Sequence, residues 1–156
     1  FYFARQSLGE YADLAWASYL IFSDTLKILR IRGNAMQNAV PKGEGGMLAV
    51  LGSKIEIVEK ILKSNEKNFQ VQIANDNSEG QIVLSGKNED LNKIIMVFKD
   101  DSIKYIKLPV SAPFHCELMS NATKIMREEL NKLNFKNSEN KLITNVTAKL
   151  IANSDE

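Results

Sequence analysis

Ser7 stands where the chain changes from an aromatic, strand-forming run at residues 1–4 to a helical pattern. That pattern has apolar residues at Leu8, Tyr11, Ala12, Ala15 and Tyr19. A serine at a strand-to-helix turn can be a nucleophile, because the turn exposes the hydroxyl and the helix N-terminus stabilises the developing oxyanion. The usual pattern is Gly-x-Ser-x-Gly, and Arg5 occupies the first glycine position. A serine that only caps a helix would have a similar local sequence, so both interpretations are open.

Two further residues could work with a serine nucleophile. Arg32 lies on a predicted helix over residues 25–40, on or beside its apolar stripe, where a guanidinium needs an anionic or accepting partner. His115 is the only histidine, in a proline-containing loop before a predicted helix over residues 117–133, where an imidazole can act as a general base. A structural salt bridge for Arg32 and a plain polar role for His115 are the alternatives. We do not expect Cys116 to pair with His115, because adjacent residues rarely present their side chains to each other.

The composition limits the class of protein. With 156 residues, 44% hydrophobic and 25% charged, the chain can form one domain, or a larger domain and a small one. A net charge of +1 gives no reason to expect nucleic acid or a membrane surface as partner. No apolar run approaches the roughly 18–20 residues that span a bilayer, and no secretory signal opens the chain. The single cysteine excludes an internal disulfide and fits a reducing compartment, so we expect a cytoplasmic protein.

The middle of the chain has its own order of elements. Strands are predicted at residues 47–52, 69–74, 81–86 and 102–108, and helices at 53–64 and 91–99. This order, β-α-β-β-α-β, is that of a ferredoxin-like unit, with a turn at residues 75–80 between the hairpin strands. Pro41 and Pro109 flank the unit, so we interpret it as an insertion in a larger α/β domain.

The outer segments predict a parallel sheet. Residues 1–4 form a strand that leads into the turn at Ser7, and residues 142–146 predict a second buried strand. A strand before such a turn normally has neighbours on both sides in a parallel sheet. We therefore expect this chain to be a piece of a longer protein.

Taken in order, these segments resemble the malonyl-CoA:acyl-carrier-protein transacylases, over essentially all 156 residues. Residues 7–11 (Ser-Leu-Gly-Glu-Tyr) are similar to the nucleophile segment of that family, and residues 32–41 to its substrate-carboxylate segment. Residues 109–116 (Pro-Val-Ser-Ala-Pro-Phe-His-Cys) are similar to its histidine segment. Weaker similarities lie at residues 45–52, 75–86 and 144–146.

The resemblance implies an α/β fold. Part of a hydrolase-like, parallel-sheet large domain would carry an inserted ferredoxin-like small subdomain. Residues 1–45 and 109–156 would belong to the large subdomain, and residues 46–108 to the small one.

The resemblance also implies a role for each site residue. Ser7 would take the malonyl group from malonyl-CoA as an acyl-enzyme and pass it to the phosphopantetheine thiol of acyl carrier protein, in fatty acid biosynthesis. His115 would be the general base, and Arg32 would bind the malonyl carboxylate with two parallel hydrogen bonds. The remaining substrate-binding residues would be Leu8, through its backbone N–H at the oxyanion, Met36 and Phe114. The bulk of Phe114 favours malonyl over methylmalonyl.

Malonyl-CoA and acyl carrier protein would be the partners of a protein that is monomeric at full length and needs no cofactor or metal. Arg5 and Gln6 depart from the Gly-His of the family. The family's second oxyanion donor and the glutamine that supports its histidine would lie before residue 1 and after residue 156. Losing one oxyanion donor costs roughly 10²–10³ in rate, so we expect little transacylase activity from this polypeptide alone. A non-catalytic remnant that binds a partner and a serine esterase are the alternatives.

Overall fold

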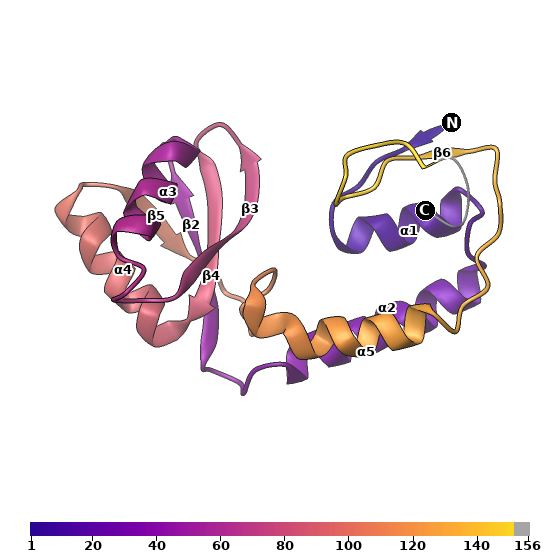
Figure 1. Ribbon diagram of the computed structural model, residues 1–156, viewed down its shortest axis with the longest axis horizontal. Helices are drawn as coiled ribbons and strands as arrows, with labels where there is room; N and C mark the ends of the chain where they lie inside the picture. The colour runs from indigo at the N-terminus through magenta and orange to yellow at the C-terminus, as the bar shows by residue number, and fades with distance from the viewer. Residues whose placement is uncertain (152–156) are drawn as a thin grey trace. The chain divides into compact units, whose positions relative to one another are not determined.

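The computed structural model describes residues 1–151, which divide into two compact units (Figure 1). The first unit comprises residues 1–34 and the described residues from 124 onward, and the second comprises residues 35–123. Helices α2 (Phe22–Asn38) and α5 (Ser120–Leu130) each contain a point where one unit passes into the other along the chain. The subdomain limits expected from the family resemblance stay a prediction.

The second unit is built on a four-stranded antiparallel sheet with strand order β3-β4-β2-β5. The strands are β2 (Gly45–Leu51), β3 (Val71–Ser78), β4 (Gln81–Lys87) and β5 (Lys104–Lys107). The helices are α3 (Ile55–Ser64), between β2 and β3, and α4 (Asn88–Asp100), between β4 and β5. The β-α-β-β-α-β order predicted from the sequence is therefore observed, and α3 and α4 lie beside the sheet (Figure 1).

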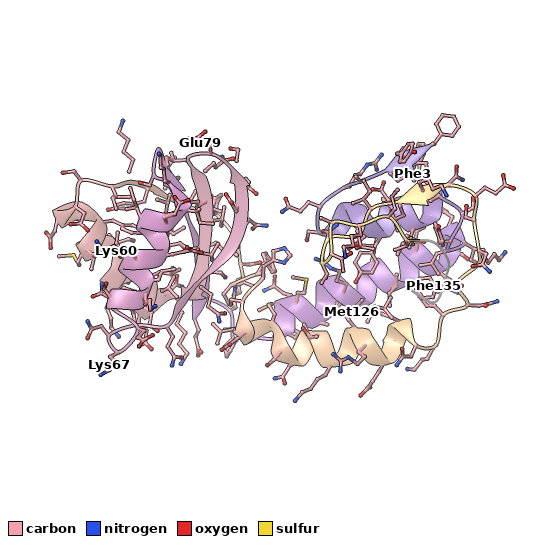
Figure 2. All side chains as sticks on the ribbon, turned by 45° about the horizontal axis from the view of Figure 1, so that its top comes forward. Phe3, Lys60, Lys67, Glu79, Met126 and Phe135 are labelled. Carbon is pink, nitrogen blue, oxygen red and sulfur yellow. The ribbon has the colours of Figure 1, made fainter. Side chains whose placement is uncertain are left out.

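One apolar core joins these helices to the sheet. Side chains alternate across a strand, so Leu48 and Val50 of β2 share a face with Leu84 of β4. Val58 of α3 and Phe98 of α4 are fully buried against that face. Burial of each such side chain contributes about 1.5–3 kcal/mol, which holds this unit together. Lys60 is exposed and lies on α3 (Figure 2).

The hairpin of this unit is longer than predicted. Residues 75–80 were expected to be a turn, but β3 continues to Ser78, with Asp76 paired to Ile82 between two irregularities in register. The turn itself is confined to Glu79 and Gly80, where Gly80 has a φ of 77° that favours glycine. Irregular pairing lets polar residues occupy an edge strand despite their low strand propensity.

The first unit contains a short parallel pair. Strand β1 (Tyr2–Phe3) pairs with β6 (Lys141–Leu142), and α1 (Leu8–Trp16) follows β1. A small core forms around Ala17, Tyr19 and Leu142, with Phe3 packed against it (Figure 2). With the antiparallel sheet of the second unit, this pair gives an α/β fold that contains both kinds of sheet.

The prediction of a strand over residues 142–146 was wrong, because the strand ends at Leu142. The chain turns instead: Thr144 N–H donates to Lys149 O at 3.1 Å, and Ala148 N–H donates to Thr144 O at 3.0 Å. This turn presents Asn145 at the start of α1, as described below. Across residues 1–151 we find no helix of the length and apolar character that a membrane crossing requires.

Candidate active site

Ser7 lies in the turn between β1 and α1 with an unusual backbone conformation. Its φ is 56° and its ψ is −113°. Such a conformation costs of order 1–3 kcal/mol in a non-glycine residue, and a strained turn is typical of a serine at a nucleophile elbow. Ser7 occupies the N-cap position of α1, but its side chain makes no capping hydrogen bond. The simpler interpretation, in which the hydroxyl only caps the helix, is therefore wrong.

The side chain of Asn145 bridges the two ends of this turn. Its Oδ1 accepts a hydrogen bond from Ser7 N–H, and its Nδ2 donates to Arg5 O at 2.7 Å. Its backbone N–H donates to Glu10 Oε1 at 2.9 Å, which ties the same loop to the first turn of α1. The sequence predicts a strand at Asn145 and gives no clear sign of a role for its side chain. The only signal was an amide side chain, able to donate and accept at once, in a polar stretch.

Arg32 on α2 directs its guanidinium at the Ser7 hydroxyl. Nη2 donates to Ser7 Oγ at 2.9 Å, and Cζ lies 5.6 Å from the centre of the Tyr11 ring. Burial raises the pKa of the Tyr11 phenol, while the charge of Arg32 opposes that rise. Within residues 1–151 Arg32 forms no salt bridge with an acidic side chain, so the structural ion pair considered as an alternative is not found. A guanidinium in this place can hold an anionic group beside the hydroxyl.

The N-terminus of α1 is where the sequence predicts that an oxyanion would bind. Leu8 is the first residue of the helix, so its backbone N–H lies at the positive end of the helix dipole. Its side chain is 57% exposed and does not join the apolar stripe expected from the sequence. Met36 is half-buried on α2, one helical turn after Arg32.

His115 lies in the second unit, in the loop between β5 and the short 3₁₀ helix η1 (Glu117–Met119). Its side chain is exposed, and its φ of 58° is again a conformation that side chains rarely adopt. Gln72 of β3 secures the following residues, since its Oε1 accepts a hydrogen bond from Glu117 N–H at 2.7 Å. Nothing in the sequence predicts this role for Gln72.

The residues before His115 fit closely against β2. A Cβ atom on Gly45 would lie 2.4 Å from the ring of Pro113, so only glycine allows the loop to approach this strand. Cys116 Sγ donates to Pro113 O at 3.1 Å, which closes the loop around the histidine. Phe114 is half-buried, with its N–H donating to Ala112 O at 3.1 Å.

The predicted site residues thus fall into two groups. Ser7, Leu8 and Arg32 belong to the first unit, and its structure brings Ser7 and Arg32 into contact. Met36, Phe114 and His115 belong to the second unit. The pairing of Ser7 with His115 stays a prediction. No group of three or more histidine, cysteine, aspartate or glutamate residues between residues 1 and 151 is placed to hold a metal ion.

In this α/β protein a serine with positive φ lies between a strand and a helix, with a guanidinium on its hydroxyl, which is the arrangement expected of a nucleophile elbow. The acyl transferase domain family matches residues 2–155, and the chain belongs to that family.

Relatives and solved structures agree with this assignment. The malonyl CoA-acyl carrier protein transacylase of Bacillus subtilis (strain 168) is 40% identical over 147 residues, which are 93% of this chain and 46% of the relative. That of Escherichia coli (strain K12) is 35% identical over 153 residues, 97% of this chain and 50% of the relative. The crystal structure of the Clostridium perfringens transacylase superposes with a TM-score of 0.89 at 38% identity, covering 95% of this chain and 47% of that one.

A further solved structure contains a malonyl-transacylase in complex with a polyketide acyl-carrier protein. That transacylase is 31% identical to this chain with a TM-score of 0.91, covering 97% of this chain and 50% of that one. The chain spans about half the length of the curated relatives it matches.

Proposed function

We propose that this chain is part of a malonyl-CoA:acyl-carrier-protein transacylase that acts in fatty acid biosynthesis. The observation that carries the proposal is the 2.9 Å contact between Arg32 Nη2 and Ser7 Oγ. A positive charge that already touches the nucleophile suits an acyl donor with a free carboxylate, such as a malonyl thioester. A neutral ester, the substrate of a serine esterase, would gain nothing from this arginine. The names of the relatives support the same substrate.

In the proposed reaction Ser7 Oγ attacks the thioester carbonyl carbon of malonyl-CoA, and its proton passes to the imidazole of His115. The carbon–sulfur bond breaks, and the departing thiolate of coenzyme A takes that proton. The phosphopantetheine thiol of acyl carrier protein then gives a proton to His115 and attacks the malonyl ester. Ser7 leaves as an alkoxide and recovers the proton, which returns the enzyme to its starting state.

Arg32 and the helix N-terminus would supply specificity and charge stabilisation. Arg32 would exchange its bond to Ser7 Oγ for two bonds to the malonyl carboxylate, and Leu8 N–H would donate to the oxyanion. Hydrogen bonds to charged groups contribute about 1.5–3 kcal/mol, which would favour malonyl over acetyl by roughly one to two orders of magnitude. Met36 and Phe114 would line the acyl site, with Phe114 disfavouring methylmalonyl.

The proposal includes a finer architecture. The first unit would belong to a hydrolase-like parallel-sheet domain, and residues 46–108 would be its inserted ferredoxin-like subdomain. The protein would act in the cytoplasm, with acyl carrier protein as partner, without a cofactor, and as a monomer at full length. Because the chain spans about half the length of its relatives, we assign the reaction to the longer protein and expect little activity from these residues alone.

A chimera tests the proposal. This chain would replace the matching 46% of the Bacillus subtilis relative, so that the remaining segments of the domain are present. We expect intact-mass analysis to show a malonyl adduct after incubation with malonyl-CoA, and none in Ser7→Ala. Arg32→Ala should lower malonyl transfer roughly 10- to 100-fold and leave acetyl transfer unchanged.

Arg30→Ala is the matched control, because Arg30 is an exposed arginine on the same helix. It should leave both transfers at their original rates. A folded chimera that stays unmodified would favour the non-catalytic remnant. Equal loss of malonyl and acetyl transfer in Arg32→Ala would show that the arginine does not read the carboxylate.

A further inference from the structure

Asp13 is a carboxylate buried inside the first unit. It lies on α1 with 0% exposure, and among residues 1–151 neither of its oxygens has a hydrogen-bond partner. Its ion pair is with Arg5, whose Nε lies 3.3 Å from Asp13 Oδ1. A buried carboxylate without a compensating charge is strongly unfavourable, so the fold around Asp13 depends on Arg5.

Arg5 is held from a second side by Trp16. Its guanidinium carbon lies 5.8 Å from the centre of the indole ring, within the range of a cation–π contact. The Arg5 side chain remains 52% exposed, so water still solvates part of its charge. Arg5 therefore runs along α1, where its charged group contacts Asp13 and Trp16.

Arg5 also occupies the place where the elbow pattern has a glycine, and Gly9 provides the space it needs. A Cβ atom on Gly9 would lie 2.5 Å from Arg5 Cβ. The turn can therefore still approach α1 closely, because the residue without a side chain is Gly9 on the helix and not residue 5 in the turn.

We propose that Arg5 and Asp13 are a matched pair that positions the Ser7 turn, with Arg5 anchored on α1 in place of the usual glycine. Arg5 is then a positioning residue and not a sign of a damaged elbow. The anchor reaches Ser7 through the main chain, because Arg5 O and Ser7 N–H are the two groups bridged by Asn145. This inference concerns the geometry of the turn and holds whether or not Ser7 accepts an acyl group.

A double-mutant cycle tests the pairing, with urea unfolding followed by the fluorescence of Trp16, the only tryptophan in the chain. Arg5→Ala leaves the buried carboxylate unpaired and should lower the folding equilibrium constant at least about tenfold. Asp13→Ala should lower it less than about threefold, because the half-exposed guanidinium can turn to water. The double variant should stay within about fivefold of Asp13→Ala, because it loses in addition only the exposed cation–π contact with Trp16. Additive losses would overturn the pairing.

The positioning role has its own readout in Asp13→Ala, which we expect to stay folded. Its Ser7 amide should exchange with deuterium faster than in the wild type, and Ser7 should react more slowly with a fluorophosphonate probe. The exposed pair of Asp24 and Lys27 on α2 is the matched control, since Asp24→Ala should leave both measurements unchanged. Unchanged exchange and labelling in a folded Asp13→Ala would show that the pair only stabilises the unit.

Discussion

Asn145→Ala should loosen the Ser7 turn without unfolding the chain. The substitution removes two side-chain hydrogen bonds, one from Ser7 N–H and one to Arg5 O, and keeps the bond from its own N–H to Glu10. Each such bond contributes about 1 kcal/mol net, for a total of about 2 kcal/mol. Both bonds lie at an exposed position, where water replaces the lost partners. We therefore expect the free energy of unfolding to fall by about 1–2 kcal/mol.

The assay combines thermal unfolding with amide exchange. A loss of about 1–2 kcal/mol corresponds to a fall in Tm of roughly 2–8 °C for a protein of this size. The Ser7 amide loses its acceptor, so its exchange should accelerate more than that of amides within α1. Asn134→Ala, at an exposed position of the same unit, should change neither quantity appreciably. Equal effects of the two substitutions would refute the reasoning.

Three further predictions concern the second unit. Gln72→Leu removes the acceptor beside the histidine loop and should alter the line widths of the ring-proton NMR signals of His115, the only histidine; unchanged signals would contradict this. Burial opposes ionisation of Asp90, yet its hydrogen bonds from Lys93 and from Gln70 N–H, with the nearby lysine charges, together outweigh burial and lower the pKa of the carboxyl. The stability gained from this lowered pKa is present above the ordinary pKa of the carboxyl and is lost as pH falls below about 4. In urea titrations, the free energy of unfolding of Asp90→Asn should therefore depend less on acid than that of the wild type. Gly45→Ala would place a Cβ 2.4 Å from the Pro113 ring and should cost about 1–3 kcal/mol by urea unfolding.

The elements of the second unit could be predicted because each has a clear local pattern. Strand β2 is a short, continuous apolar run, and α3 repeats its apolar residues at helical spacing. The end of β3 could not be predicted in this way. Asp76 pairs with Ile82 in spite of its low strand propensity, because the neighbouring strand determines the ladder and not the residue itself.

In the first unit, residue type alone gave the wrong buried face for α1, because a charged residue on that helix is paired with a residue outside it. Periodicity placed Leu8 on the apolar stripe of α1, but Leu8 is 57% exposed and Asp13 is fully buried. Asp13 lies away from the predicted stripe, and an aspartate on the buried face of α1 becomes acceptable only once Arg5 lies beside it. The sequence gives these two residues no visible link. Ser7 and Arg32 could be named as candidate site residues from the sequence, but their contact joins residues 25 positions apart and could not be read from it.

The two strained residues of the site share one structural solution. Ser7 and His115 both have a positive φ, a backbone conformation that costs free energy in a residue with a side chain. Each turn would therefore relax if nothing else held it. In each case an amide side chain far away in the sequence accepts a hydrogen bond from a backbone N–H at or near the strained residue: Asn145 from that of Ser7, and Gln72 from that of Glu117. Because these contacts are made only after distant segments have folded together, each turn should relax when its amide is removed, while the helix that follows it remains.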